Sequence, residues 1–160
     1  GKRVVLTEET DWIGGQLTNQ AVPPDEHRWI EQFGANRTYR QFRERVRRFY
    51  RENYALTERG YRAERWNPGG GFVSHMTLEP RVGWLVLNEM LSPALASGRL
   101  TLLLEHRPVA ADCDGDRVKA VTVEDIHSGD RQVIEAPYFI DATETGELFP
   151  AISVATASMV

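Results

Sequence analysis

The feature that most constrains the fold is a short apolar run near the start of the chain that ends in an acid and is followed by two adjacent glycines. Residues 2–8 are rich in β-branched and apolar side chains and end at Glu8, and Gly14 and Gly15 follow after a short interval. This pattern predicts a buried strand, a carboxylate at its C-terminal end, and a turn where the backbone approaches another group closely. A carboxylate in this position can accept hydrogen bonds from the ribose hydroxyls of a dinucleotide. Glu8 is therefore the first candidate site residue.

The clearest helix that the sequence predicts covers residues 38–53. Thr38 and Gln41 have the spacing of a capping box, in which side chains satisfy free N–H groups at a helix start. Apolar side chains then recur with helical periodicity, at Tyr39, Phe42, Val46 and Phe49. We therefore expect one face of this helix to pack against the rest of the protein.

The other faces of this predicted helix are basic. They carry Arg37, Arg40, Arg43, Arg45, Arg47, Arg48 and Arg51. Such a face is compatible with an anionic partner, and equally with a solvated surface whose long side chains cover apolar groups. The net charge of −4 and the absence of aromatic residues from the basic face of the helix favour the solvated surface.

A second helix is predicted to begin at Glu79 and Pro80, because proline is tolerated in the first helical turn and an acid there interacts favourably with the helix dipole. Gly98 is a natural end, and Pro93 predicts a kink or an earlier end. The predicted apolar face consists of Val82, Leu85, Leu87, Met90 and Leu91. A buried strand over residues 100–105 follows, and a helix that leads into such a strand is typical of a parallel sheet.

The last third of the chain has a different pattern. Apolar and polar residues alternate over residues 109–112, 117–124 and 131–135. Turn sequences centred on Gly115 and Gly129 separate these segments, so an antiparallel meander is predicted. A final buried strand is predicted over residues 138–142.

Three consecutive glycines, Gly69 to Gly71, lie in a turn-rich segment. They do not have the Gly-x-Gly-x-x-Gly spacing and no strand leads into them, so they are not a phosphate-binding loop. A plain surface loop and a wall beside a ligand both remain open. His75 follows this loop and is a candidate acid or base, because histidine is the residue type best suited to proton transfer at physiological pH, although a lone loop histidine is more often structural. No pair of histidines has metal-ligand spacing, and no metal site is predicted.

Four elements of the sequence together resemble the FAD-dependent oxidoreductases of the glutathione-reductase-like structural class, in particular a bacterial group. They are Glu8 to Gly15, Asn67 to Gly71, His75 to Val82, and Phe139 to Leu148. The resemblance implies an α/β fold over residues 1–150, namely a partial Rossmann-like FAD-binding domain whose parallel sheet contains an inserted antiparallel meander. Residues 20–98 would be a helical insertion on the substrate side. Residues 151–160 fit no element.

The resemblance also implies the cofactor, FAD, and the residues that bind it. These are Glu8, Gly14, Gly15, Gln16, Val109, Asp141, Ala142, Thr143 and Gly146. Glu8 would hold the adenosine ribose and the backbone of Val109 would contact the adenine. The two glycines would allow a close backbone approach, and the segment from Asp141 to Gly146 would lie near the phosphates.

The chain departs from this family in one respect, because it contains no Gly-x-Gly-x-x-Gly turn to hold the cofactor pyrophosphate. The first residues match the point where the family has completed that turn and its helix. We therefore expect a piece of a longer protein. Without the missing strand, two sheet edges would lack a neighbour, so self-association is expected of the chain by itself. Weak FAD binding is also expected of it, because the turn that holds the pyrophosphate is absent.

The predicted function is that of an FAD-dependent oxidoreductase, in which flavin accepts a hydride or electrons from an unidentified small organic substrate. The alternative is a noncatalytic α/β binding module that uses the basic helix or the glycine loop on an anionic partner. The acidic balance argues against a nucleic-acid partner. No membrane span or export signal is visible, and the single cysteine, Cys113, fits a reducing compartment, so a cytoplasmic location is expected.

Overall fold

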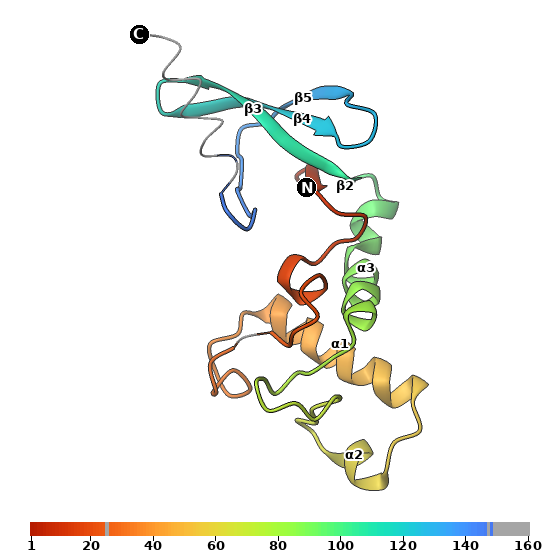
Figure 1. The fold of residues 1–160 in the computed structure, drawn as a ribbon. Helices are drawn as coiled ribbons and strands as arrows, with labels where there is room; N and C mark the ends of the chain where they lie inside the picture. The colour runs from red at the N-terminus through yellow and green to blue at the C-terminus, as the bar shows by residue number, and fades with distance from the viewer. Residues whose placement is uncertain (25, 147, 149–160) are drawn as a thin grey trace. The chain divides into compact units, whose positions relative to one another are not determined.

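Residues 1–24, 26–146 and 148 are described by the structure, a computed structural model (Figure 1). The chain divides into two units. Unit 1 consists of Gly1–Trp12 and Arg99–Val160, and unit 2 is Ile13–Gly98. Each unit has a hydrophobic cluster of its own. The predicted tail at residues 151–160 lies outside the described residues.

Unit 1 contains a two-stranded parallel sheet. β1 (Val4–Glu8) pairs with β2 (Leu100–Leu104), in a register that runs from Val4 beside Leu100 to Glu8 beside Leu104. Both strands were predicted, to within a residue or two. Their parallel direction agrees with the expectation that a helix leads into the second strand, since parallel strands need a long connection.

The predicted meander is confirmed as a separate three-stranded antiparallel sheet. β3 (His106–Asp114), β4 (Arg117–Asp125) and β5 (Arg131–Glu135) pair in chain order. Gly115 and Gly129 have positive φ angles of 61° and 74°, as the turns between strands require. The core of unit 1 is formed by Ala111, Cys113, Val121, Val123 and Leu148.

The strand predicted over residues 138–142 is wrong. This segment is not a strand, and the side chains of Tyr138 and Ile140 are 74% and 89% exposed. Of the described hydrophobic residues in this segment, Phe139 packs partly against the unit 1 core. A strand forms where another backbone satisfies its N–H and C=O groups, and no strand of the described residues lies alongside this segment.

Unit 2 is built from helices and loops. It contains α1 (Arg37–Asn53), α2 (Glu58–Arg62), α3 (Pro80–Ala96) and the short 3-10 helix η1 (Gly15–Leu17). α1 and α3 enclose the unit 2 core, to which the long loop after α2 adds Met76. Of these elements, α2 was not predicted.

The start of α1 differs from the predicted capping box. Asn36, not Thr38, is the cap, because its Oδ1 accepts a hydrogen bond of 2.8 Å from the Tyr39 N–H. Asparagine and threonine both cap helices, so the sequence alone placed the helix but not its first residue. Phe42 and Val46 of the predicted apolar face are buried, together with Tyr50 one turn further on.

α3 begins at Pro80 as predicted, and Gly98 lies just beyond its end with a φ of 66°. Pro93 lies inside the helix. The buried side chains are Val82 and Val86, with Met90 partly buried beside them. The prediction that Leu85 lies on the apolar face is wrong, because its side chain is exposed and is not part of the unit 2 core. The side chains of α3 that face the core, Val82, Val86 and Met90, are four residues apart.

The fold class is therefore mixed α/β, with a parallel and a separate antiparallel sheet. The Rossmann-like character and the proposed division at residues 20–98 stay predictions. Among the described residues, no helix is both long enough and apolar enough to cross a membrane.

Candidate functional site

Glu8 lies at the C-terminal end of β1, next to the end of β2. In α/β proteins, ligands bind at the carboxyl ends of parallel strands, because loops of variable sequence meet there. This edge of the sheet in unit 1 is therefore the first place to look for a binding site.

The carboxylate of Glu8 is fixed by the next loop. Its Oε1 accepts a hydrogen bond from the Thr10 N–H and lies 2.9 Å from both the nitrogen and the Thr10 Oγ1. Its Oε2 has no partner among the described residues. One of the two oxygens expected to face a ribose is thus already occupied, and the other is available.

Glu105 joins this loop to the meander. Its N–H donates to the Thr10 carbonyl over 3.1 Å, and its carbonyl accepts from the Ile126 N–H over 2.9 Å. Glu105 has a φ of 58°, which is unusual for a residue with a side chain and is often found at functional sites. Sequence reasoning missed this residue, since nothing in its type indicates a left-handed backbone.

The side chain of Glu105 also pairs with His127. Glu105 Oε1 lies 2.7 Å from His127 Nε2. The hydrogen bond and negative charge of Glu105 raise the pKa of His127, and the Asp125 charge adds to the effect. Both side chains face solvent, so this pair contributes little to stability.

Val109, the predicted adenine contact, lies at a β-bulge. Pro108 pairs with Val123 and Ala110 pairs with Thr122, so Val109 is the extra residue between them. The ladder is interrupted here, as is common next to binding sites. β1 and β3 are in contact, which places Glu8 and Val109 on neighbouring elements of unit 1.

In the segment from Asp141 to Gly146, which was predicted to lie near the phosphates, the Asp141 side chain accepts hydrogen bonds from residues that follow it. Asp141 Oδ1 accepts hydrogen bonds from the Thr143 N–H and Oγ1, and its Oδ2 accepts from the Leu148 N–H. Ala142 and Thr143 are exposed, and Gly146 has a φ of 73°. The Thr143 N–H is therefore committed to Asp141.

Gly14, Gly15 and Gln16 belong to unit 2. Both glycines have positive φ angles, 132° and 49°. At Gly14, a Cβ atom would overlap the buried side chain of Thr18, whose hydroxyl donates to the Ile13 carbonyl. The close approach predicted for this turn is thus made by Thr18, and an approach of cofactor to the two glycines and Gln16 stays a prediction.

The triple-glycine loop is organised by Asn67. The Asn67 side chain donates to the carbonyls of Gly71 and Ser74 and accepts from the Thr77 N–H. A Cβ atom at Gly69 would collide with the Thr77 side chain. Packing against Thr77 within the loop explains Gly69 and Gly71, and a positive φ of 62° explains Gly70.

His75 is exposed, and its ring has no hydrogen-bond partner among the described residues. Its carbonyl accepts from Arg47 at 3.5 Å. The catalytic role of His75 stays a prediction.

Two arginines of α1 contradict the expectation of a solvated basic face. Arg43 and Arg47 are 2% and 5% exposed. Both form ion pairs with Glu31, and Arg43 also pairs with Glu26. Helical periodicity had placed both arginines outside the apolar stripe, and sequence gave no indication that a loop carrying two acids would fold over them.

These two buried arginines and two partly buried acids, which we call the Arg43–Arg47 network, have further partners. Tyr39 and Ser74 donate to Glu26, and Arg47 Nε donates to the Trp66 carbonyl over 2.8 Å. Burial by itself raises the pKa of Glu31, but hydrogen bonds and charges from Arg47 and Arg43 outweigh it, so the pKa lies below its usual value. Arg43 and Arg47 are therefore paired inside the protein and are not available to an anionic partner, which the alternative of a binding module required.

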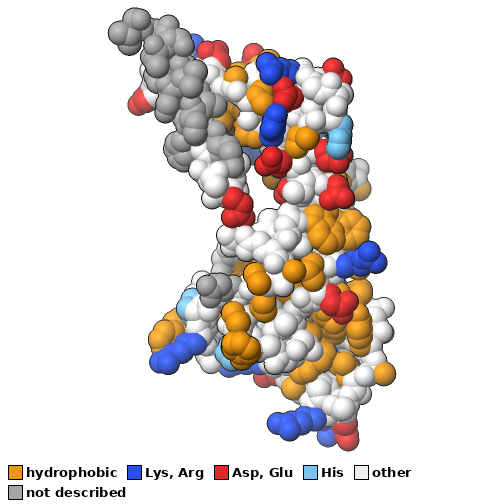
Figure 2. All heavy atoms as spheres, in the orientation of Figure 1, with side chains coloured by type: hydrophobic (Ala, Val, Ile, Leu, Met, Phe, Trp, Pro, Cys, Tyr) orange, Lys and Arg blue, Asp and Glu red, His pale blue; other side chains and the backbone are white. Residues whose placement is uncertain are grey.

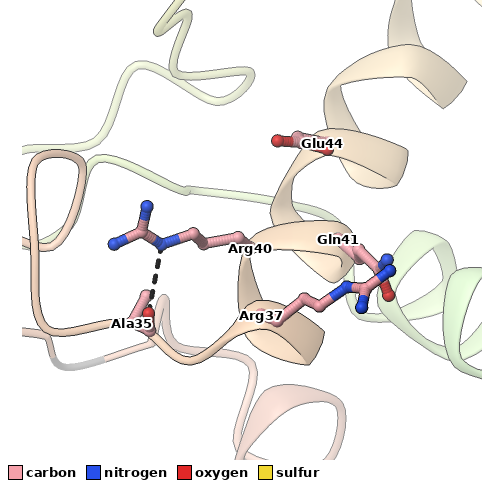
Figure 3. A pocket seen from close by; sticks show the side chains of 5 residues that line it. All are labelled: Ala35, Arg37, Arg40, Gln41 and Glu44. Atoms are coloured by element: carbon pink, nitrogen blue, oxygen red, sulfur yellow. Dashed lines mark hydrogen bonds between the residues drawn. The ribbon is translucent and has the colours of Figure 1, made fainter.

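A cavity of about 440 Å³ lies in unit 2 at the start of α1 (Figure 3). It is lined by Ala35, Arg37, Arg40, Gln41 and Glu44. Arg40 Nε donates to the Ala35 carbonyl, and Figure 3 shows Arg37 beside Gln41. None of the predicted site residues lines this cavity.

The surfaces of the units differ in character. Charged side chains of both signs lie together over the meander, and hydrophobic side chains reach the surface in unit 2 (Figure 2). On the meander, Glu124 pairs with both Arg107 and Arg131. Within the described residues there is no group of three or more His, Cys, Asp or Glu side chains placed to hold a metal ion.

Comparison with known proteins gives one result. The sequence model of a family described as FAD dependent oxidoreductase matches residues 1–158. No curated protein and no solved structure matches the chain significantly.

Proposed function

The chain belongs to the FAD dependent oxidoreductase family, whose cofactor is FAD, and from this premise we propose that Glu8 and Val109 of unit 1 hold the adenosine end of that cofactor. The observation that carries the proposal is Glu8 Oε2, a carboxylate oxygen at the end of a parallel strand without a partner among the described residues. A carboxylate oxygen is an acceptor that a ribose hydroxyl can satisfy.

The bulge at Val109 supports the adenine contact. A bulged residue leaves the ladder, so its backbone groups can pair with a ligand instead of with β4. The backbone N–H and C=O of one residue match the donor and acceptor pattern on the edge of an adenine ring. The adenosine end of FAD thus fits the residues present in unit 1.

The fit at the phosphate end is poorer. The Thr143 N–H already donates to Asp141, and the chain has no Gly-x-Gly-x-x-Gly turn. We propose that Asp141, Ala142, Thr143 and Gly146 shape this end of the site. Bound FAD would supply the redox chemistry, and these residues would supply binding and orientation.

The test is a titration of the chain, followed by NMR, with ADP, FAD and FMN. FMN lacks the adenosine, so ADP and FAD should perturb the amide signals around Glu8 and Val109 while FMN should not. Glu8→Gln should weaken ADP binding about tenfold or more, because hydrogen bonds to a charged acceptor are among the stronger ones.

Glu9→Gln is the matched control. Glu9 is the adjacent, exposed acid, and its substitution makes the same change in net charge. It should leave ADP affinity within about twofold of wild type, because exposed charges act weakly. An equal loss in both variants, or FMN binding as strong as that of ADP, would refute the proposed adenosine site.

A further inference from the structure

Thr10 provides two groups to one oxygen of Glu8. Its N–H and its hydroxyl both lie 2.9 Å from Glu8 Oε1. A carboxylate oxygen accepts about two hydrogen bonds in its plane. When both Thr10 groups donate, Oε1 is saturated and Oε2 is the oxygen that remains for a ligand.

The position of Thr10 is itself determined by the fold of unit 1. Its carbonyl accepts from Glu105, the residue with the left-handed backbone at the end of β2, and Glu105 is held in turn by Ile126. The Thr10 hydroxyl also lies 2.8 Å from the Trp12 carbonyl. A hydroxyl has one hydrogen, so it donates to Glu8 or to Trp12 at any moment, while the N–H always points at Glu8.

From this arrangement we propose that Thr10 is a positioning residue that fixes the Glu8 carboxylate and directs Oε2 toward the ribose hydroxyls. This inference rests on the proposed adenosine site and adds to it the source of selectivity for ribose over deoxyribose. A carboxylate that is fixed before binding loses less rotational freedom when the ligand arrives, which favours the ligand with the matching hydroxyl.

The experiment compares ADP with 2′-deoxy-ADP on the same chain, with affinities measured by NMR titration. In the wild type, ADP should bind about tenfold or more tightly than the deoxy analogue. Thr10→Val removes the hydroxyl and keeps the size of the side chain. It should reduce the ADP to 2′-deoxy-ADP affinity ratio by about fivefold, since one hydrogen bond to the carboxylate is lost.

Thr10→Ser restores the hydroxyl and should restore the ratio. Thr101→Val is the matched control, because Thr101 is an exposed residue of β2 whose side chain has no partner among the described residues. A purely structural role of Thr10 would weaken both nucleotides alike and leave their ratio unchanged. An amide spectrum of each variant establishes that it is folded.

The outcomes separate the two proposals. If the wild type binds ADP and Glu8→Gln weakens it, but Thr10→Val leaves the ratio unchanged, the positioning role of Thr10 is wrong and the adenosine site stands. If the wild type does not respond to ADP, the adenosine site is wrong and the role of Thr10 is overturned with it.

Discussion

Among the described residues, two that are not glycine adopt a positive φ, namely Ala21 at 53° and Glu105 at 58°. For residues other than glycine this conformation costs roughly 1–2 kcal/mol. At Glu105 the cost is accompanied by two backbone hydrogen bonds, to Thr10 and from Ile126, that join the end of β2 to both neighbouring segments. The strain therefore lies beside the proposed ribose contact.

Glu105→Gly should stabilise unit 1 by up to about 1 kcal/mol, because glycine adopts positive φ without steric cost. The backbone hydrogen bonds at this position do not depend on the side chain and should persist. The measurement is urea denaturation followed by fluorescence and by circular dichroism.

His127→Ala is the control for this prediction, because it removes the pair with Glu105 without changing the backbone. The paired side chains are largely exposed, so this variant should change the free energy of unfolding little. If Glu105→Gly destabilises the protein, its positive φ is not a source of strain.

At the scale of elements, α1 depends on contacts at its start and on its buried side. Asn36 satisfies an N–H group of the first turn. Asn36→Ala should cost about 1 kcal/mol of stability. Thr38→Ala, which would be as damaging if the capping box existed, should be nearly neutral. Comparable losses in thermal melts of the two variants would contradict the observed cap.

The buried side of α1 carries the Arg43–Arg47 network. Arg47→Met should destabilise unit 2 by about 3–5 kcal/mol, because it leaves Glu31 buried with one cation fewer. Arg48→Met is the matched control on the same helix. Arg48 pairs with Glu89 at the surface, and this change should cost less than about 1 kcal/mol. If chemical denaturation gives the two variants similar losses in the free energy of unfolding, the buried ion pairs of Arg47 do not stabilise the protein more than the exposed pair of Arg48.

The same network predicts how stability depends on pH. Folding lowers the pKa of Glu31, so the unfolded chain binds its proton at higher pH than the folded protein does. The stability that Glu31 contributes is fully present above its unfolded pKa and is lost as pH falls through its folded pKa. Glu31→Gln should therefore be less stable at neutral pH and should lose less stability on acidification, as denaturation at several pH values would reveal.

At the scale of the whole molecule, β1 is a strand with one unpaired edge among the described residues. Among the described residues it pairs with β2 alone, and Val4, Val5 and Leu6 are exposed. Apolar strands with a free edge tend to add another strand. This observation gives a structural basis to the expectation of self-association.

We predict that the average mass measured by light scattering rises with protein concentration and that Val5→Lys lowers it, because a charged side chain opposes pairing at an exposed strand. Tyr61→Lys is the control, since Tyr61 is an exposed apolar residue on a helix, where no strand can be added. A monodisperse monomer at all concentrations would contradict this prediction.

The sequence by itself determined the elements whose signals are local. The alternation of apolar and polar residues fixed the meander, and helical spacing with Pro80 and Gly98 fixed α3. The apolar run before Glu8 likewise predicted β1 and the position of its carboxylate. These features depend on residues within one turn or one strand of each other, so their pattern is visible in a single sequence.

The tertiary structure alone decided the features that require a distant partner. Residues 138–142 have the composition of a strand but, among the described residues, no strand beside them. Arg43 and Arg47 have the spacing of surface residues but are buried and paired with two acids from a loop. Glu8 was visible as an acid, whereas its fixation by Thr10 and Glu105 was not. Hydrogen bonds and ion pairs between distant segments depend on which segments the fold brings together, and the local periodicity of the sequence does not contain this information.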